Sequence, residues 1–388
     1  MSEALPQFLS KKLSRIRKVG WERTLIVQKP LSPLQRQIKG QNYLQFSSND
    51  YLGLSKDQRI IRSGIEAAQV YGTGSTGSRL ITGTTDLHTR LEEALAEFTG
   101  REAALFFSSG YSANLGVISA LIGSGDAIYA DAYNHASLKS GATLSGAMSV
   151  TYGHLDYANL RSKLQATRHL YQNALLVSDS IFSMDGDQAD LKVLIDLSHE
   201  FDLWLMVDEA HSLGVFGKHG RGLCHGLDVP ILMGTGSKAF GVEGGFVAGS
   251  RNLIDYMIQR ASSFKYSTAP TPFTVGALGK SLEIIDSAEG DLLRQKLQVN
   301  ANRIRAICLE AGFDCIKGDS PIIIIPTRDI DQAQTWSTLL WQAGIWIQPI
   351  RPPTAPAARL RITASALLEE DQLKQLRLAL QSMNRSPK

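Results

Sequence analysis

Lys238 lies in a run of small residues that suits a reactive amine. The run TGSKAFG (235–241) follows an apolar stretch and sets this lysine between Ser237 and Ala239. An amine attacks a carbonyl only when it is unprotonated, so it needs partial desolvation or a neighbouring cation. Small neighbours would also let a flat molecule approach, so Lys238 could form a Schiff base. The alternative is a solvated loop lysine, because short motifs have many chance matches.

Asp208 is predicted at the carboxyl end of a strand. The motif VDEAHSLG (207–214) closes the apolar run 203–207, and α/β sheets bind their ligands at that end of the strands. A carboxylate there could hold a pyridine nitrogen protonated and so turn the ring into an electron sink. A helix N-cap is the alternative. The letters DEAH also occur in helicases, but the nearest phosphate-loop match, GALGKS (276–281), has its glycines too close together.

The motif SSGYSAN (108–114) has the features of a phosphate site. It follows the strand-like run 103–107 and precedes a helical pattern that continues to Leu121. Backbone N–H groups and the positive end of the helix dipole would bind a phosphate there, although an ordinary helix N-cap has the same sequence. With Asp208 and Lys238, this motif gives three points that could hold a phosphate, a ring nitrogen and an aldehyde.

Motifs spread along nearly the whole chain resemble those of one enzyme family. They are FSSNDYLGLS (46–55), GSRLITGTTDLH (77–88), SSGYSAN, NHASL (134–138), FSMDGD (182–187), VDEAHSLG, TGSKAFG, YSTAPTP (266–272), IRPPT (350–354) and RLRIT (359–363). The set resembles the pyridoxal 5′-phosphate enzymes of the aspartate aminotransferase fold (fold type I), and among them the α-oxoamine synthases. The resemblance implies a large α/β domain with a mostly parallel seven-stranded sheet and a smaller α+β C-terminal domain.

The resemblance also implies which residues bind the cofactor. Lys238 would form the Schiff base with pyridoxal 5′-phosphate and later remove the α-proton of the amino acid. Asp208 would pair with the ring nitrogen, and His135 would stack on the ring. The other implied contacts are Ser183 and His211 at the phenolic oxygen, Gly110, Tyr111 and Thr235 at the phosphate, and Thr268 from a second subunit. That last contact implies a homodimer with a shared active site.

The implied reaction joins an L-amino acid to an acyl thioester with loss of carbon dioxide. The expected substrates are L-alanine and pimeloyl-CoA, or its carrier-protein thioester, in biotin biosynthesis. Arg361 and Asn49 would bind the amino-acid carboxylate, and Arg23 would face the acyl substrate. Glycine-using relatives, which make aminoketobutyrate or 5-aminolevulinate, carry threonine at the position of Ser78. They remain the alternative, and a non-catalytic cofactor-binding scaffold is the alternative outside enzymes.

Composition narrows the class of protein. The net charge of +3 is too balanced to imply a nucleic-acid partner and is compatible with small anionic substrates. Three cysteines are too few and too irregularly spaced for a disulfide framework or a zinc site, which favours a reducing cytoplasm. Residues 1–21 lack the apolar core of a signal peptide, and Leu9, Leu13 and Ile16 have the spacing of an amphipathic helix that docks on a partner surface. No apolar run reaches membrane-spanning length.

Alternating strand and helix signals predict the fold and three parts of the chain. Strands are expected at 103–107, 127–130, 149–152, 175–178, 203–207, 231–235 and 245–249, and in a smaller domain at 322–325, 346–348 and 360–363. The predicted parts are an arm (1–50) with a hairpin around 40–42, a large domain (51–285) and a small domain (286–388). The glycines of 72–77 match a dinucleotide fingerprint, but helical residues precede them, so we interpret the segment as a loop near the cofactor.

Overall fold

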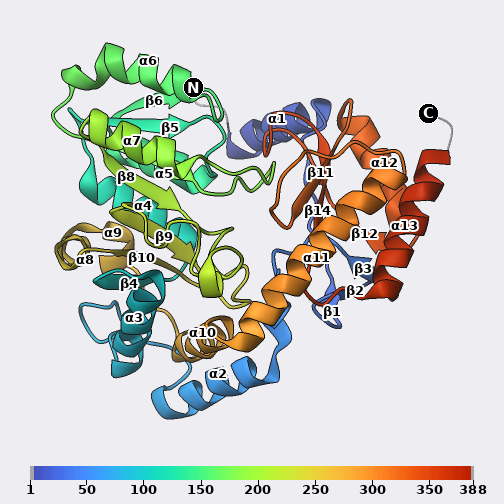
Figure 1. The fold of residues 1–388 in the computed structure, drawn as a ribbon, viewed down its shortest axis with the longest axis horizontal. Coiled ribbons are helices and arrows are strands. Elements are labelled where there is room, and N and C mark those ends of the chain that lie inside the picture. The colour runs from blue at the N-terminus through green and yellow to red at the C-terminus, as the bar shows by residue number, and fades with distance from the viewer. Residues whose placement is uncertain (1–3, 386–388) are drawn as a thin grey trace. The chain divides into compact units, whose positions relative to one another are not determined.

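The structure is a computed structural model that describes residues 4–385 (Figure 1). The chain forms two compact units, which are treated separately below. The larger unit comprises Asn49–Ser183 and Asp187–Gln298, and the smaller comprises the described residues up to Ser48, Met184–Gly186 and the chain from Val299. The predicted three-part division at residues 50 and 285 stays a prediction.

A seven-stranded sheet forms the centre of the larger unit. Its strands are β4 (Ala103–Phe107), β5 (Ala127–Asp131), β6 (Met148–Tyr152), β7 (Ala174–Asp179), β8 (Trp204–Asp208), β9 (Ile231–Thr235) and β10 (Gly245–Gly249), in the order β4-β10-β9-β8-β7-β5-β6. Only β10 runs antiparallel to its neighbours. Every residue of β4, β7, β9 and β10 is buried, as expected for a sheet covered on both faces. The predicted fold class is confirmed.

Helices cover this sheet. They are α2 (Gln58–Tyr71), α3 (Asp86–Thr99), α4 (Gly110–Leu121), α5 (Ala136–Ser145), α6 (Tyr157–Thr167), α7 (Leu191–Glu200), α8 (Arg251–Arg260), α9 (Ser262–Lys265) and α10 (Pro272–Ile285), with 3₁₀ turns η1 (Leu54–Lys56), η2 (Arg168–Leu170) and η3 (Lys218–Gly220). In Figure 1, α2 lies along α10. Val117 of α4, Leu138 of α5 and Met206 of β8 belong to one buried apolar cluster. Because α4 and α5 pack into this core, their N-terminal residues are held firmly at the sheet.

The ends of α3 and α4 follow sequence signals. Thr85 and His88 form a capping box before α3, and Gly100 ends that helix with φ 66°, a left-handed conformation that glycine adopts without strain. Ser109 caps α4, because its side chain accepts a hydrogen bond from Ser112 N. The helix α4 ends at Leu121, where its predicted helical pattern stops. The helix α2 directly precedes the glycines of 72–77, so the dinucleotide alternative lacks its strand.

The smaller unit contains two sheets. One has the order β1-β2-β3-β12 and the other β11-β14-β13. Their strands are β1 (Lys29–Pro30), β2 (Gln35–Ile38), β3 (Gln41–Gln45), β11 (Ile322–Pro326), β12 (Ile345–Trp346), β13 (Pro349–Ile350) and β14 (Arg359–Thr363). The helices are α1 (Leu5–Lys18), α12 (Ile330–Gln342) and α13 (Glu370–Arg385), and α11 (Ala288–Glu310) contributes residues to both units.

Two local predictions in this unit need correction. The hairpin turns at Lys39 and Gly40, which both have positive φ, so Gln41 and Asn42 already belong to β3. The single strand expected at 346–348 is two short strands: β12 pairs with β3, and β13 pairs with β14 in the other sheet. Pro349 has no N–H group, so it pairs only at the edge strand β13, and the chain changes sheets just before it.

The amphipathic N-terminal helix is present, but its apolar side chains are not covered. None of the residues of α1 is buried, and Leu9, Leu13 and Ile16 are all exposed. Its docking on a partner surface stays a prediction. Among the helices within residues 4–385, none has the length and apolar character that crossing a membrane requires.

Candidate active site

Most of the predicted cofactor residues meet at one edge of the seven-stranded sheet. Asp208 ends β8 and Thr235 ends β9, while Gly110 begins α4 shortly after β4. Since β10 is antiparallel to both β4 and β9, these two strands run in the same direction, and β8 is parallel to β9. Their carboxyl ends therefore share one edge, as the strand predictions require.

Asp208 is a buried carboxylate with both oxygens engaged. The residue is 3% exposed, Oδ1 accepts a hydrogen bond from Ala210 N at 2.9 Å, and Oδ2 accepts one from Asn114 Nδ2 at 2.8 Å. Asn114 lies on α4 and is fully buried. These two donors fix the carboxylate at the strand end, and as an acceptor it suits a protonated ring nitrogen.

A chain of hydrogen bonds connects Asp208 with His135. Asn114 Nδ2 also donates to Ser137 Oγ at 2.8 Å, and that oxygen lies 2.7 Å from His135 Nδ1. His135 is the N-cap of α5, and its N–H donates to Asp179 Oδ2 at 2.8 Å. His135 thus lies at the start of α5, its stacking on a ring stays a prediction, and the sequence did not indicate the linking roles of Asn114 and Ser137.

Asp208 and Lys238 both act on the charge of His135. Desolvation lowers the pKa of the His135 ring, the Asp208 carboxylate raises it, and the Lys238 ammonium lowers it. Burial raises the pKa of Asp179 well above its usual value, the Asp208 charge raises it further, and Lys238 lowers it. The amine, the imidazole and the two carboxylates thus interact electrostatically. A neutral His135 could lie flat on an aromatic ring without a charge to solvate.

The backbone around Gly110 makes a narrow cradle. Gly245 comes so close that an added Cβ would lie 2.3 Å from Gly110 N, and a Cβ on Gly110 would lie 3.4 Å from Thr235 Oγ1. The Thr235 hydroxyl donates to Gly244 O at 2.7 Å. Tyr111 is partly exposed and donates its hydroxyl hydrogen to Ser140 Oγ of α5 at 2.8 Å. Gly110, Tyr111 and Thr235 are thus together at a helix N-terminus, where the N–H groups and helix dipole favour an anion.

Lys238 lies in a loop closed by backbone hydrogen bonds. Gly236 N donates to Gly244 O at 3.0 Å, and Gly241 N donates to Lys238 O at 2.9 Å. Gly241 has φ 67°, and an added Cβ there would lie 2.5 Å from Ser55 N, so no larger residue fits. The loop holds Lys238 half-buried after β9, which supplies the partial desolvation that a reactive amine needs.

His211 has a partner that the sequence did not indicate. The Tyr51 hydroxyl lies 2.6 Å from His211 Nδ1, and Tyr51 itself is fully buried. Tyr51 belongs to the motif FSSNDYLGLS, which was the available signal. Asn49 is two residues earlier, and its carbonyl accepts a hydrogen bond from Tyr51 N at 2.8 Å. Ser183 is half-buried and is the last residue of the segment Asn49–Ser183 of the larger unit.

Ser78 and Thr268 lie side by side in the larger unit. They form an isolated antiparallel bridge, although they are far apart in the sequence. Arg79, next to Ser78, makes a buried bidentate ion pair with Glu92, at 2.8 and 2.9 Å. The bridge and the ion pair fix the segment that carries Ser78.

The remaining predicted residues, Arg23 and Arg361, belong to the smaller unit. Arg361 is buried in β14 and donates to Thr363 Oγ1 at 3.1 Å. Arg23 is exposed and donates to the carbonyls of Arg351 and Pro352 at 3.3 and 3.0 Å, which places it against the IRPPT motif. Partial burial, and then the neighbouring Arg351, lower the pKa of Arg23.

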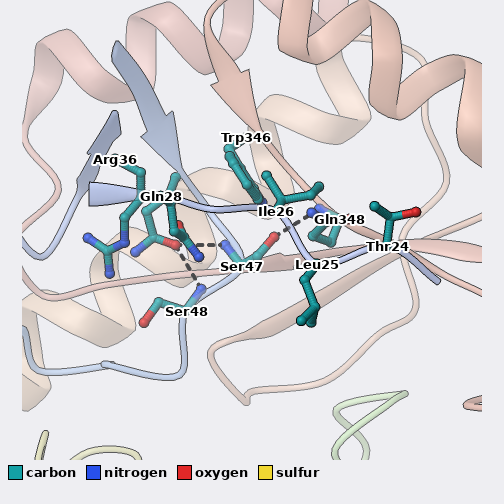
Figure 2. Close-up of a pocket in the computed structure, with 10 residues that line it drawn as sticks. Thr24, Leu25, Ile26, Gln28, Arg36, Ser47, Ser48, Trp346 and Gln348 are labelled. Carbon is teal, nitrogen blue, oxygen red and sulfur yellow. Dashed lines mark hydrogen bonds between the residues drawn. The ribbon is translucent and has the colours of Figure 1, made fainter. Parts of the chain in front are cut away.

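The smaller unit also has a polar cavity of about 410 Å³ (Figure 2). Its lining comprises Thr24, Leu25, Ile26, Gln28, Arg36, Gln45, Ser47, Ser48, Trp346 and Gln348. Gln45 Oε1 accepts hydrogen bonds from Ser47 N and Ser48 N, and Ser47 Oγ accepts one from Gln348 N. None of the predicted site residues lines this cavity.

Comparison with known proteins agrees with this geometry. The aminotransferase class I and II family matches residues 41–380. A relative from Rippkaea orientalis named "Putative 8-amino-7-oxononanoate synthase" is 43% identical over 375 residues, covering 95% of this chain and 97% of the relative. Another of the same name, from Acetivibrio thermocellus, is 44% identical over 335 residues and covers 85% of both chains.

Solved structures show the same similarity. A serine palmitoyltransferase variant from S. paucimobilis with bound PLP has a TM-score of 0.92 at 29% identity, covering 99% of both chains. The 8-amino-7-oxononanoate synthase of Francisella tularensis has a TM-score of 0.74 at 29% identity, covering 88% of this chain and 97% of that one.

Fold, site and comparisons together define a pyridoxal 5′-phosphate enzyme of fold type I. The chain belongs to the aminotransferase class I and II family, and within it to the α-oxoamine synthases, which are acyltransferases. The groups at the sheet edge fit the cofactor: a glycine cradle at a helix N-terminus for the phosphate, a buried carboxylate for the ring nitrogen, and a half-buried lysine for the aldehyde.

Proposed function

We propose that the chain condenses L-alanine with pimeloyl-CoA, or with pimeloyl carrier protein, to form 8-amino-7-oxononanoate, carbon dioxide and the free thiol. This reaction belongs to biotin biosynthesis, which we place in the cytoplasm. The observation that carries the chemistry is the convergence of Lys238, His135 and Asp208 at one sheet edge. The pimeloyl assignment is supported by the names of relatives about 40% identical over most of the chain.

Pyridoxal 5′-phosphate supplies an aldehyde that condenses with amines and a ring that accepts the electron pair left when a proton is removed. Lys238 supplies the amine that holds the cofactor and, once displaced by the substrate amine, the base that takes the α-proton. Asp208 keeps a proton on the ring nitrogen, which strengthens the electron sink. His135 covers the ring face and excludes water, while Ser183 and His211 hold the phenolic oxygen.

Other residues bind the charged ends of the ligands. Gly110, Tyr111 and Thr235 hold the phosphate through N–H and hydroxyl groups, with Thr268 of the partner subunit completing the set. We assign Arg361 and Asn49 to the amino-acid carboxylate, because a guanidinium binds a carboxylate through two parallel hydrogen bonds. Arg23 is assigned to the acyl substrate. The roles of Arg23, Arg361 and Asn49 rest on their match to the family motifs.

Amino-acid choice is predicted to depend on Ser78. Its side chain is smaller than threonine, which leaves space for the methyl group of alanine. One methyl group is worth only about 1 to 3 kcal/mol, or roughly 10- to 200-fold in kcat/KM, so we expect preference rather than exclusivity. The wild type should release free CoA faster with L-alanine and pimeloyl-CoA than with glycine and acetyl- or succinyl-CoA. Ser78→Thr should move the ratio of kcat/KM toward glycine by about tenfold.

The assay is a panel of amino acids and thioesters with release of free CoA as readout. It should include L-serine with palmitoyl-CoA, because a serine palmitoyltransferase is among the similar structures. Ser75→Thr is the matched control, since Ser75 lies in the same loop and donates its hydroxyl hydrogen to Pro270 O at 2.7 Å. Faster turnover by the wild type with glycine and acetyl-CoA would remove the biotin-pathway assignment and leave the chemistry at Lys238 intact.

We also propose that two copies of the chain form a dimer around the segments of Ser78 and Thr268. Ile81 and Tyr266, close in sequence to this bridged pair, are 80% and 81% exposed, and Leu80 is exposed as well. Large apolar side chains gathered at one place on a surface are typical of an interface. A second copy that covers them would bring its own Thr268 to this chain's phosphate site.

Thr268→Ala is expected to raise the cofactor dissociation constant about tenfold or more, because a hydrogen bond to a charged group contributes about 1.5 kcal/mol or more. Ser267→Ala is the control. Ile81→Asp should yield monomers in sedimentation equilibrium and should bind the cofactor more weakly. Adding Thr268→Ala to the Ile81→Asp variant should then cause no further loss of cofactor affinity. If Thr268→Ala raised the cofactor dissociation constant of the monomer as much as that of the dimer, Thr268 would not act across subunits.

A further inference from the structure

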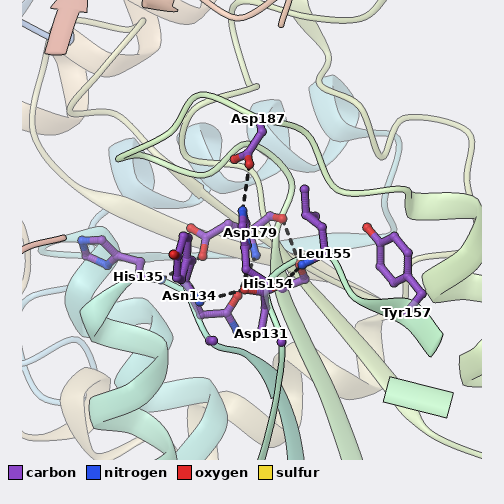
Figure 3. A network of polar contacts seen from close by, with 12 residues as sticks. Asp131, Asn134, His135, His154, Leu155, Tyr157, Asp179 and Asp187 are labelled. Atoms are coloured by element: carbon purple, nitrogen blue, oxygen red, sulfur yellow. Dashed lines mark hydrogen bonds and ion pairs between the residues drawn. The ribbon is translucent and has the colours of Figure 1, made fainter. Parts of the chain in front are cut away.

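His154 lies between two carboxylates in the larger unit (Figure 3). Its Nδ1 is 2.9 Å from Asp131 Oδ1, and its Nε2 is 2.8 Å from Asp187 Oδ2. A neutral imidazole has one N–H group, so it can donate to only one of these acceptors. With both carboxylates ionised, both hydrogen bonds form together only when the ring is an imidazolium. The position of the two carboxylates therefore selects the charged form.

Two aromatic side chains hold the same ring. Tyr133 stacks on it with the centroids 4.1 Å apart and the planes at 15°, and Phe182 meets it edge-on at 4.5 Å and 85°. The face of Tyr133 stacked on the imidazole favours a cationic ring, and the T-shaped contact with Phe182 packs it. The four contacts of His154 come from two segments, 131–135 and 182–187. His154 is thus the point at which these segments are joined.

The segment 131–135 leads directly to His135. Asp131 Oδ1 also accepts a hydrogen bond from Tyr133 N at 2.7 Å, and Asp131 O accepts one from Asn134 N at 3.1 Å. The Asn134 side chain donates to Val177 O at 2.9 Å. In Figure 3, the His135 ring projects away from this network. A change in the Asp131 carboxylate would therefore alter the turn that aims His135.

The segment 182–187 is the loop that contains Ser183. Asp187 O accepts a hydrogen bond from Phe182 N at 3.0 Å, and Ile181 pairs with Gln188 in an isolated bridge. These contacts close the base of the loop, and Asp187 and Phe182 both contact His154 there. His154 therefore attaches the base of the Ser183 loop to the end of β5.

The groups around His154 keep it charged over a wide pH range. Burial alone would lower the pKa of His154, but the hydrogen bonds and charges of Asp131 and Asp187 raise it to about 9. Burial raises the pKa of Tyr157 to about 12, and it raises the pKa values of Tyr152 and Asp179 well above their usual values. These neighbours add no positive charge that would oppose the imidazolium.

We propose that His154 is a positioning residue, which as an imidazolium fixes the two segments that carry His135 and Ser183. The proposal rests on the proposed function in one respect only, the assignment of His135 and Ser183 to the cofactor. His154 contacts neither of these side chains in the network described, so it acts through Asp131 and Asp187.

The sign of the pH dependence follows from the raised pKa. The stabilisation by His154 is fully present below the pKa of a histidine in the unfolded chain, about 6.5, and is lost as the pH rises through about 9. The melting temperature of the wild type should therefore fall between pH 7 and pH 10 by more than that of His154→Gln. Glutamine cannot carry the charge and can donate to only one carboxylate at a time.

The charge state is tested by long-range ¹H–¹⁵N spectra of histidine-labelled protein without added cofactor. His154→Gln assigns the signal. His199→Gln is the matched control, because His199 pairs with one carboxylate, that of Asp228 at 2.8 Å, on the surface. The His154 signal should keep the imidazolium pattern at pH 7.5 and titrate near pH 9. A neutral pattern at pH 7.5 would overturn the proposal, whatever the protein catalyses.

Positioning is tested on the neighbouring loops. His154→Gln should shift the His135 signal in the same spectra, and His199→Gln should not. In the cofactor-loaded enzyme, His154→Gln should lower kcat about tenfold with little change in KM. The wild type should lose rate as the pH rises through about 9, and the variant should not. Unchanged His135 signals and an unchanged pH profile would contradict the proposal.

Asp187→Asn is the second variant, and it keeps the test decisive if His154→Gln folds poorly. It keeps the size of the side chain but removes one of the two charges, so the His154 titration should move well below pH 9. A titration that stays near pH 9 would count against the proposal. Failure to find cofactor on Lys238 would instead remove the proposed function, while the charge and loop results on His154 would still stand.

Discussion

Lys238→Ala is expected to lower turnover by about 10⁴-fold, because it removes the side chain to which we assign both the amine that holds the cofactor and the base that takes the α-proton. A positioned base alone contributes about 10²- to 10⁴-fold. The proposed phosphate cradle at Gly110 and Thr235 remains in the variant, so it should still bind pyridoxal 5′-phosphate, without the covalent bond.

The measurement is direct. The wild type should have a visible absorption band that borohydride bleaches, and peptide mapping should place the reduced adduct on Lys238. Lys139→Ala is the matched control, since Lys139 lies near His135 but donates to the backbone carbonyl of Ala132 at 2.7 Å. It should retain the band and most of the activity. An adduct on any other lysine would refute the whole site assignment.

The large sheet could be predicted from sequence because its strands are short, continuous apolar runs. The runs 103–107, 231–235 and 245–249 match β4, β9 and β10 without change, and the other four differ by one residue at one end or at both ends. Such runs are typical of strands buried on both faces. The smaller sheets were harder, because the segment 345–350 divides between two sheets, and pairing partners far along the chain decide where it does so.

The candidate site was predictable where a residue ends a strand or begins a helix. Asp208, Thr235 and Gly110 occupy such positions, so strand and cap signals located them, while His135 was located by its motif alone. The supporting contacts were not predictable in this way. Asn114 reaches Asp208 across 94 positions, and Tyr51 reaches His211 across 160, so only the tertiary structure brings these pairs together. His154 is a similar case, because its two carboxylates come from separate segments.

Asp208→Asn is expected to reduce the rate while leaving the cofactor bound. Both carboxylate oxygens already accept hydrogen bonds, from Ala210 N and Asn114 Nδ2. A substituted amide has one acceptor oxygen, so its NH₂ group would face one of these donors or the ring nitrogen. Without the carboxylate charge the pKa of the ring nitrogen would fall, so the ring would lack the proton that stabilises the negative charge developing on it. We expect a loss of at least about 3 to 4 kcal/mol of transition-state stabilisation, or roughly two to three powers of ten in kcat.

Steady-state kinetics with L-alanine and pimeloyl-CoA, together with cofactor titration, separate the two effects. The cofactor dissociation constant of Asp208→Asn should stay within a few-fold of the wild type, because the substitution leaves the proposed phosphate site at Gly110, Tyr111 and Thr235 unchanged. Asp228→Asn is the control: this carboxylate is exposed and pairs with His199, so its variant should have wild-type kcat. Near-normal turnover by Asp208→Asn would mean that Asp208 does not hold the ring nitrogen. Its burial and its bonds to Asn114 and Ala210 would then serve only to join β8 to α4.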